Sequence, residues 1–146
     1  MTVYPDERLS QQIVACTPDG VIFADRGGVI RFWNAGAEAI FGYAAQEAVG
    51  QALELIVPEQ LRARHNEGYR RVMQTGETRY SGRRLLAVPA MRKNGERISV
   101  EFSIALLYDL NRTLIGVAAI MRDVTERWRK EKEMTARLAA FESKQK

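Results

Sequence analysis

Residues 92–104 of this chain, RKNGERISVEFSI, decide the fold. The Asn94-Gly95 pair is a strong signal for a tight β-hairpin, because both residues tolerate the positive φ angles that such a turn requires. After the turn, apolar and polar residues alternate, which is the period of a strand with one buried face. The apolar set is Ile98, Val100, Phe102, Ile104 and Leu106. The sequence therefore predicts two antiparallel strands that bury one face.

Further strands are expected on both sides of this hairpin. Residues 79–91 predict its first strand, and residues 114–121, LIGVAAIM, predict the strand that follows it. Because this last segment is apolar on both faces, we expect it in the centre of the sheet, covered on both sides. Near the N-terminus, GVIFAD and VIRFWN flank the turn residues 26–28, Arg-Gly-Gly, and predict a second hairpin.

Helices are expected between the two hairpins. Asn34 is a good N-cap for a short helix that Gly42 closes. Pro58 suits the first position of a longer helix that runs to about Gln74. The apolar stripe of that longer helix consists of Leu61, His65, Gly68 and Val72. The only histidine of the chain is therefore expected on the inward face of this helix.

Both ends of the chain predict flanking helices. An apolar stripe of Leu9, Ile13 and Cys16 lies within residues 1–17, and Met134, Leu138 and Phe141 follow coiled-coil spacing within residues 125–146. We expect a flanking helix at 1–17, a domain at 18–124 and an output helix at 125–146. The predicted fold class is α+β: a five-stranded antiparallel sheet with helices packed on one face.

The composition excludes several function classes. The 146 residues include one cysteine and one histidine, so neither an internal disulfide nor a thiolate metal cage can form. A Ser-His-Asp enzyme would depend on His65 alone, and we expect no enzyme. The net charge of +4 accompanies no recognition motif, so no nucleic-acid partner is expected. No signal peptide and no apolar run of about 18 residues is present, which favours a cytoplasmic location without membrane contact.

Several motifs, taken in order, resemble the PAS family. They are PDGVIFAD at 18–25, RFWNAGAEAIFGY at 31–43, Gly50, RKNGERISVEFSI at 92–104 and RDVTER at 122–127. The resemblance covers roughly residues 8–130 and implies a PAS fold. It also implies a signal-transduction function, in which a ligand held between helix and sheet alters the arrangement of an output helix.

Residues 58–77, PEQLRARHNEGYRRVMQTGE, resemble the haem-binding PAS domains of rhizobial oxygen-sensing histidine kinases, which belong to two-component systems. In that group a histidine on this helix is the axial ligand of haem iron, and the shared TGE ending places it on His65. The resemblance therefore implies haem b as cofactor, His65 as metal ligand, and gas or redox sensing. The implied cofactor-binding residues are His65, Gly68, Val72, Leu85, Phe102 and Ile104.

One position departs from the resemblance. The haem-binding group carries an arginine that holds bound oxygen, and the matching position here is Leu85, or Leu86 if the length difference falls earlier. Oxygen would then lack its main polar partner. Flavin photochemistry is not expected, because the light-sensing branch uses a cysteine in the helical middle, whereas Cys16 lies on the first helix and is expected to be a small core residue.

Two alternatives to haem remain open. The domain could bind another small metabolite, or it could be a cofactor-free module for dimerisation and protein interaction. The expected partners are a small-molecule or gas ligand, a second copy of the chain, and an output domain or partner signalling protein. Asp123, Thr125 and Arg127 are expected to set the exit direction of the last helix, either by bonding the backbone or as an ordinary helix N-cap.

Overall fold

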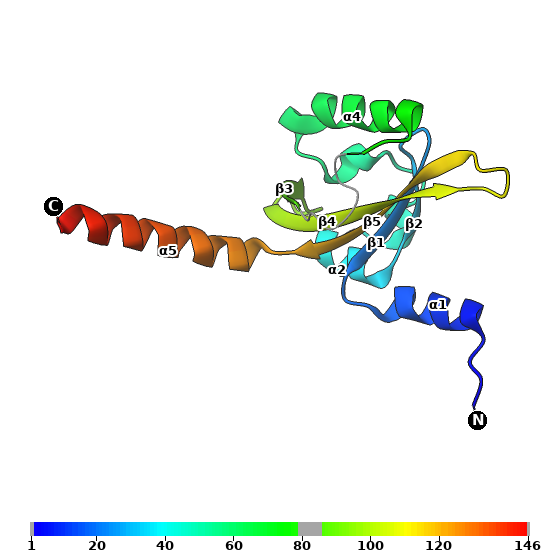
Figure 1. The fold of residues 1–146 in the computed structure, drawn as a ribbon, viewed down its shortest axis with the longest axis horizontal. Helices are drawn as coiled ribbons and strands as arrows, with labels where there is room; N and C mark the ends of the chain where they lie inside the picture. The colour runs from blue at the N-terminus through cyan, green and yellow to red at the C-terminus, as the bar shows by residue number, and fades with distance from the viewer. Residues whose placement is uncertain (1, 79–85, 146) are drawn as a thin grey trace.

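The computed structural model describes residues 2–78 and 86–145. Its centre is a five-stranded antiparallel sheet with the order β2-β1-β5-β4-β3 (Figure 1). The α+β class and the five strands are therefore confirmed. The strands are β1 Gly20–Asp25, β2 Ile30–Trp33, β3 Leu86–Met91, β4 Arg97–Tyr108 and β5 Leu114–Asp123.

Short helices connect the two halves of the sheet, and longer ones flank it. In Figure 1, α5 continues from the end of β5 and projects away from the sheet, while α4 lies to one side of it, at the top of the view. Among the described residues, no helix is both long and apolar enough to cross a bilayer. The helices are α1 Asp6–Cys16, α2 Ala35–Phe41, α3 Ala45–Ala48, the 3-10 turns η1 Leu53–Ile56 and η2 Glu59–Leu61, α4 Arg62–Thr75, and α5 Thr125–Lys144.

The hairpin predicted at Asn94-Gly95 joins β3 to β4. Gly95 has a φ of 87°, and the turn is closed by a bond from the Arg92 backbone N–H to the Glu96 carbonyl at 2.9 Å. Across the hairpin Val88 pairs with Val100, so these two side chains lie on the same face of the sheet. Alternation along β4 buries Ile98 and Val100, as the sequence predicts.

Asn34 is the polar centre of the core and is only 4% exposed. Its side-chain Oδ1 accepts bonds from the backbone N–H groups of Ala37 and Val21 at 2.9 and 2.7 Å. Its Nδ2 donates to the carbonyl oxygens of Val14 and Asp19 at 2.8 and 3.0 Å. The expected N-cap is confirmed, and the same amide also joins α1 to the start of β1.

Gly36 allows α2 to approach the chain just before β1. A Cβ atom at this position would lie 2.0 Å from the carbonyl oxygen of Asp19 and 2.9 Å from that of Pro18. Only glycine permits such contact between two backbones. The largest fully buried side chains of the main core cluster include Phe41, Ile22 and Ile30, each at most 1% exposed.

Three expectations differ from the structure. The helix expected from Pro58 begins with the 3-10 turn η2, and α4 starts only at Arg62. β5 is central, as expected, but Ile120 on its outer face is 47% exposed, so the prediction that both faces are covered is wrong. Cys16 is exposed and is not a core residue. Of the strand expected at 79–91, residues 79–85 lie outside the described residues.

Candidate functional site

A pocket of about 460 Å³ lies between α4 and the turn that joins β1 to β2. Ligand pockets in proteins commonly enclose about 300–1,000 Å³, so its size suits a small molecule. Its lining is more polar than that of a typical cofactor pocket. The residues that matter for its chemistry are Arg26, Glu54, His65, Tyr69, Arg70 and Gln74.

His65 projects from the first half of α4 and is half-buried. Its Nδ1 atom is buried and has no hydrogen-bond partner among the described residues. Burial lowers the pKa of His65 below its usual 6.5, while the Asn66 amide and the Glu54 carboxylate oppose that shift. The ring is therefore held mainly neutral near pH 7, which is the form that binds a metal ion.

Tyr69 lies one turn after His65 and fastens α4 to the β1–β2 turn. Its hydroxyl lies 2.5 Å from the carbonyl oxygen of Asp25 and 3.1 Å from that of Ala24. Burial, together with the nearby Asp25 charge, raises the pKa of Tyr69 to about 12. The phenol therefore remains a proton donor at any physiological pH, and its ring lies 6.3 Å from that of His65.

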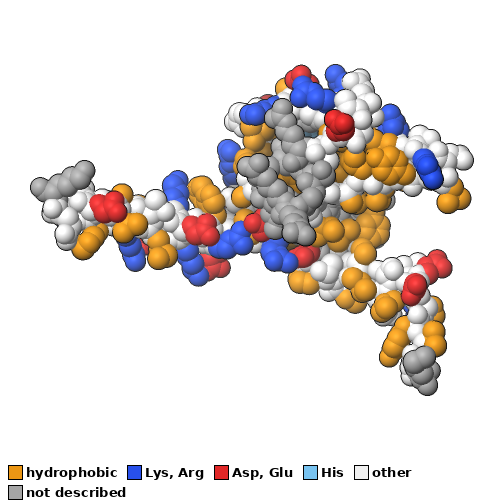
Figure 2. All heavy atoms as spheres, in the orientation of Figure 1, with side chains coloured by type: hydrophobic (Ala, Val, Ile, Leu, Met, Phe, Trp, Pro, Cys, Tyr) orange, Lys and Arg blue, Asp and Glu red, His pale blue; other side chains and the backbone are white. Residues whose placement is uncertain are grey.

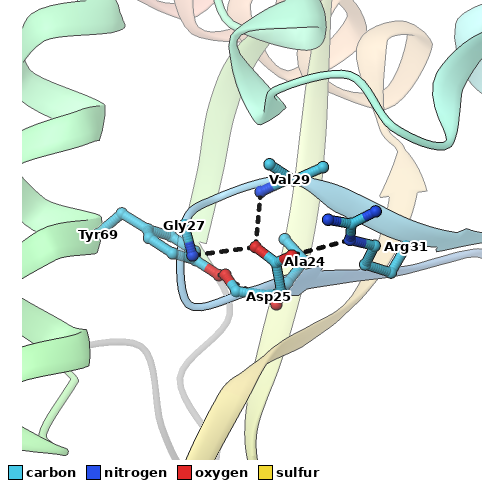
Figure 3. Close-up of polar contacts among 6 residues, drawn as sticks. All are labelled: Ala24, Asp25, Gly27, Val29, Arg31 and Tyr69. Atoms are coloured by element: carbon cyan, nitrogen blue, oxygen red, sulfur yellow. Dashed lines mark hydrogen bonds and ion pairs between the residues drawn. The ribbon is translucent and has the colours of Figure 1, made fainter.

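The Asp25 carboxylate shapes the turn that Tyr69 reaches (Figure 3). It accepts bonds from the backbone N–H groups of Gly27 and Val29 at 2.9 and 3.1 Å, and from Arg31 at 2.8 Å. Burial alone would raise the pKa of Asp25, but these three bonds outweigh it, and the pKa lies below its usual value. The turn is therefore a fixed wall of the pocket.

Two further contacts close the pocket. Asn66 donates to the Glu54 carboxylate at 2.5 Å and ties α4 to η1. Arg26 donates to the carbonyl oxygen of Leu114 at 2.8 Å and to that of Met73 at 3.3 Å. A single side chain of the β1–β2 turn thus holds both the last turn of α4 and the first residue of β5.

Of the predicted site residues that the structure describes, only His65 lines the pocket. Val72 and Ile104 instead pack together against the apolar cluster of Met73, Leu114 and Val117. Phe102 pairs with Met121 on β5. A Cβ atom at Gly68 would meet no heavy atom of the described residues within 4 Å, so these residues leave room beside α4 at this point. Leu85 lies outside the described residues, and the cofactor roles of all six residues stay predictions.

Arg26, Glu54 and Tyr69 line the pocket but were not among the predicted site residues. Tyr69 could have been found, because a residue four positions after His65 lies on the same side of a helix. Arg26 and Glu54 carry no comparable signal, since they reach the pocket from a turn and from the segment LELIV, whose structure the sequence leaves ambiguous. Among the described residues, no three His, Cys, Asp or Glu side chains gather into a metal site.

The junction of β5 and α5 is held by side-chain bonds to the sheet. The Thr125 hydroxyl accepts a bond from the Ser99 backbone N–H at 2.9 Å and donates to the Asp123 carboxylate at 2.5 Å. The N-cap residue of α5 is Val124, so the expectation of Asp123 or Thr125 as cap is wrong. The side chains of Asp123 and Thr125 do accept bonds from backbone N–H groups, as the alternative expects, and the claim that they set the exit direction of α5 stays a prediction.

Ion pairs continue the same junction on the surface. Arg122 binds Asp19 through two bonds of 3.1 Å, and Arg127 binds Glu101 at 2.9 Å. Because Asp19 immediately precedes β1, the first of these pairs links the beginning of the sheet to its exit. Exposed pairs of this kind contribute little stability on their own, about 1 kcal/mol or less.

His65 should make the free energy of unfolding depend on pH at and below about pH 6.5. Since its pKa is lowered in the folded protein, the unfolded chain takes up a proton near pH 6.5 whereas the folded protein does so only at lower pH. The contribution of His65 to the free energy of unfolding should therefore be complete above pH 6.5 and decrease as the pH drops toward the folded pKa. Urea unfolding at several pH values checks this, and His65→Gln should flatten the curve there. An unchanged slope in this variant would contradict the assignment.

Comparison with known proteins identifies the fold. The sequence profile described as PAS fold matches residues 14–129. In solved structures, the PAS domain of a protein from Colwellia psychrerythraea superposes with a TM-score of 0.72 at 20% identity, over 84% of this chain and 99% of that one. This likeness concerns the fold, and it confirms the arrangement of sheet and helices.

Three curated relatives are similar over most of the domain. An uncharacterised protein of Azorhizobium caulinodans is 36% identical over 75% of this chain, and the sensor protein FixL of Bradyrhizobium diazoefficiens is 27% identical over 91%. The oxygen sensor protein DosP of Escherichia coli is 26% identical over 59%. The matches span only 15%, 25% and 11% of these relatives' own lengths. With the profile match extending from the last turn of α1 to the beginning of α5, the chain belongs to the PAS family.

Proposed function

We propose that this PAS domain is a sensor whose ligand is held at His65, and that the ligand is haem b. The observation that carries the proposal is the His65 ring itself: it is half-buried on α4, borders a pocket, and keeps a buried Nδ1 that has no hydrogen-bond partner in the described part of the chain. A buried polar atom without a hydrogen bond is costly, and a bound group would account for it.

The charge state of His65 supports iron ligation. An axial histidine must be neutral to bind iron, and burial lowers the pKa of His65 in that direction. Gly68 does not line the pocket, but the described residues leave open space beside it, one turn after His65 on α4. Val72, Leu85, Phe102 and Ile104 stay in the proposal as haem contacts predicted from the sequence, and of these the described structure places Val72 and Ile104 beside the pocket, in the neighbouring apolar cluster. When bound, haem would supply an iron atom that takes up a diatomic gas.

The similarity to named sensors supports the same function. One relative is named an oxygen sensor protein and another a sensor protein, and the segment around His65 resembles the haem-binding PAS domains. In this proposal a change at the pocket reaches β5 and its neighbour β4, and then α5, which Thr125 ties to Ser99 on β4. A full switch from 1:99 to 99:1 needs about 5.5 kcal/mol of differential binding energy.

The partners belong to the same proposal. Leu9 and Ile13 on α1 are 42% and 60% exposed, and Met134, Leu138 and Phe141 on α5 are 70%, 59% and 60% exposed. Figure 2 shows apolar side chains at the surface of both flanking helices, interspersed on α5 with charged ones. Such helices are stable when a partner covers the apolar stripe, so we propose a homodimer that passes its signal to an output domain.

A visible spectrum tests the haem proposal. After reconstitution with haem b, the wild-type protein should show a Soret band and His65→Ala should lose it, since no other histidine exists in the chain. Gln74→Ala is the matched control, because Gln74 lines the same pocket without offering an iron ligand. Free imidazole added to His65→Ala should restore part of the band. A wild-type protein that stays colourless, or a His65→Ala band equal to that of the wild type, would refute the proposal.

A further inference from the structure

Arg26 is a cation in the pocket whose observed bonds go to neutral groups. Its guanidinium donates to the backbone carbonyl oxygens of Leu114 and Met73. A guanidinium has five N–H donors, so further donors remain for another acceptor. The neighbouring Asp25 carboxylate is already bonded to Arg31 and to the turn backbone. Among the described residues, Arg26 forms no ion pair.

Arg70 adds a second cation to the same pocket. It is exposed on α4 and forms no ion pair or hydrogen bond with the described residues. The acidic side chain of the lining, Glu54, is engaged by the Asn66 amide. Gln74, one turn after Arg70, offers a neutral amide donor to the same space. The pocket therefore has more unpaired positive than negative charge.

We propose that this pocket binds an anionic group of a small molecule, a carboxylate or a phosphate, between Arg26 and Arg70. Bonds from a guanidinium to an anion are roughly twice as strong as bonds to a neutral carbonyl. An anionic group would therefore compete with the carbonyl oxygens of Met73 and Leu114 for Arg26. The proposal shares its pocket with the proposed function, but it requires no iron.

The contacts of Arg26 give this site a consequence for signalling. In the described structure Arg26 joins the last turn of α4 to the first residue of β5. β5 is the central strand, and α5 follows directly from it. A ligand that draws Arg26 away from Leu114 would act on the strand that leads to the exit helix. Arg26 is thus a specificity-determining and positioning residue.

The site is tested by titrating the haem-free protein with inorganic phosphate and, in a separate experiment, with acetate. In a zwitterionic buffer of low ionic strength, ¹⁵N–¹H spectra should show saturable shifts of the Gly27, Gly28 and Gln74 amides. Comparison of the two anions tells a phosphate site from a carboxylate site. Arg70→Gln should weaken binding about tenfold, as loss of one charge-assisted bond predicts. Its side chain makes no bond in the structure, so its removal should not disturb folding.

Two further variants complete the experiment. Arg26→Gln should weaken binding at least as much, and Arg26→Lys should restore part of it by keeping the charge. Arg64→Gln is the matched control, because Arg64 is exposed on the same helix but does not line the pocket. Shifts that do not saturate, or that Arg70→Gln and Arg64→Gln change equally, would overturn the proposal. A Soret band without saturable anion shifts refutes this site alone, whereas saturable shifts in a colourless protein refute only the haem proposal.

Discussion

Replacement of Asn34 by alanine should lower the free energy of unfolding by about 4 kcal/mol. The amide makes four bonds inside the core, two as acceptor and two as donor. Each net hydrogen bond contributes about 1 kcal/mol, and the partners left behind at this buried position cannot all reach water. Since small domains are stable by only about 5–15 kcal/mol, this single change would remove a large part of the total.

Asn34→Asp separates the capping role from the tethering role. Aspartate caps helices as well as asparagine does, so the bonds from Ala37 and Val21 would survive. Its second oxygen, however, would face the carbonyl oxygens of Val14 and Asp19 without a proton to donate. We expect a loss close to that of alanine in urea unfolding. Asn111→Ala, at an exposed turn position, should change stability by less than about 0.5 kcal/mol. A stability equal to wild type in Asn34→Asp would show that the tethers contribute nothing.

Gly36→Ala should destabilise the domain by about 3 kcal/mol or more. The added Cβ atom would lie 2.0 Å from the Asp19 carbonyl oxygen and 2.6 Å from its carbon, and both are backbone atoms that no rotamer change can move aside. α2 would have to shift away from the start of β1. Thermal or urea unfolding measures the loss, and the far-ultraviolet spectrum shows whether the fold survives.

Gly68→Ala is the matched control for this prediction. Gly68 is also helical, but an added Cβ atom would meet no heavy atom within 4 Å in the part of the chain that the structure describes. Alanine favours a helix interior over glycine by about 1 kcal/mol, so this variant should be more stable than the wild type. If Gly36→Ala and Gly68→Ala lowered the free energy of unfolding equally, the close backbone contact at Gly36 could not explain the effect of Gly36→Ala.

The parts of the fold that local signals determine could be predicted from the sequence. Asn34 before a short helix and Asn94-Gly95 between alternating strands are such signals, because each acts on residues within a few positions. The long apolar run of β5 likewise predicted its central place. The exposure of Ile120 could not be predicted in the same way. The sequence shows that the outer face of β5 is apolar, but it does not show whether another element covers that face.

The candidate site could be predicted only in part. The stripe on α4 predicts that His65 turns inward, but a helical period does not say which element lies opposite. Tyr69 reaches a carbonyl 44 positions away and Arg26 one 88 positions away, and no local pattern encodes such pairs. His65 was therefore predictable as a candidate, whereas the turn and the arginine beside it had to come from the structure.

The pairing of Gly20 with Met121, reinforced by Asp19 and Arg122, has an architectural consequence. The chain enters the sheet at the start of β1 and leaves it at the end of β5, and these two ends lie side by side on adjacent strands. A unit of this kind can be placed between other segments of a longer chain without its core being altered. The segments that lead from α1 into the sheet and from the sheet into α5 therefore contact each other at this one edge.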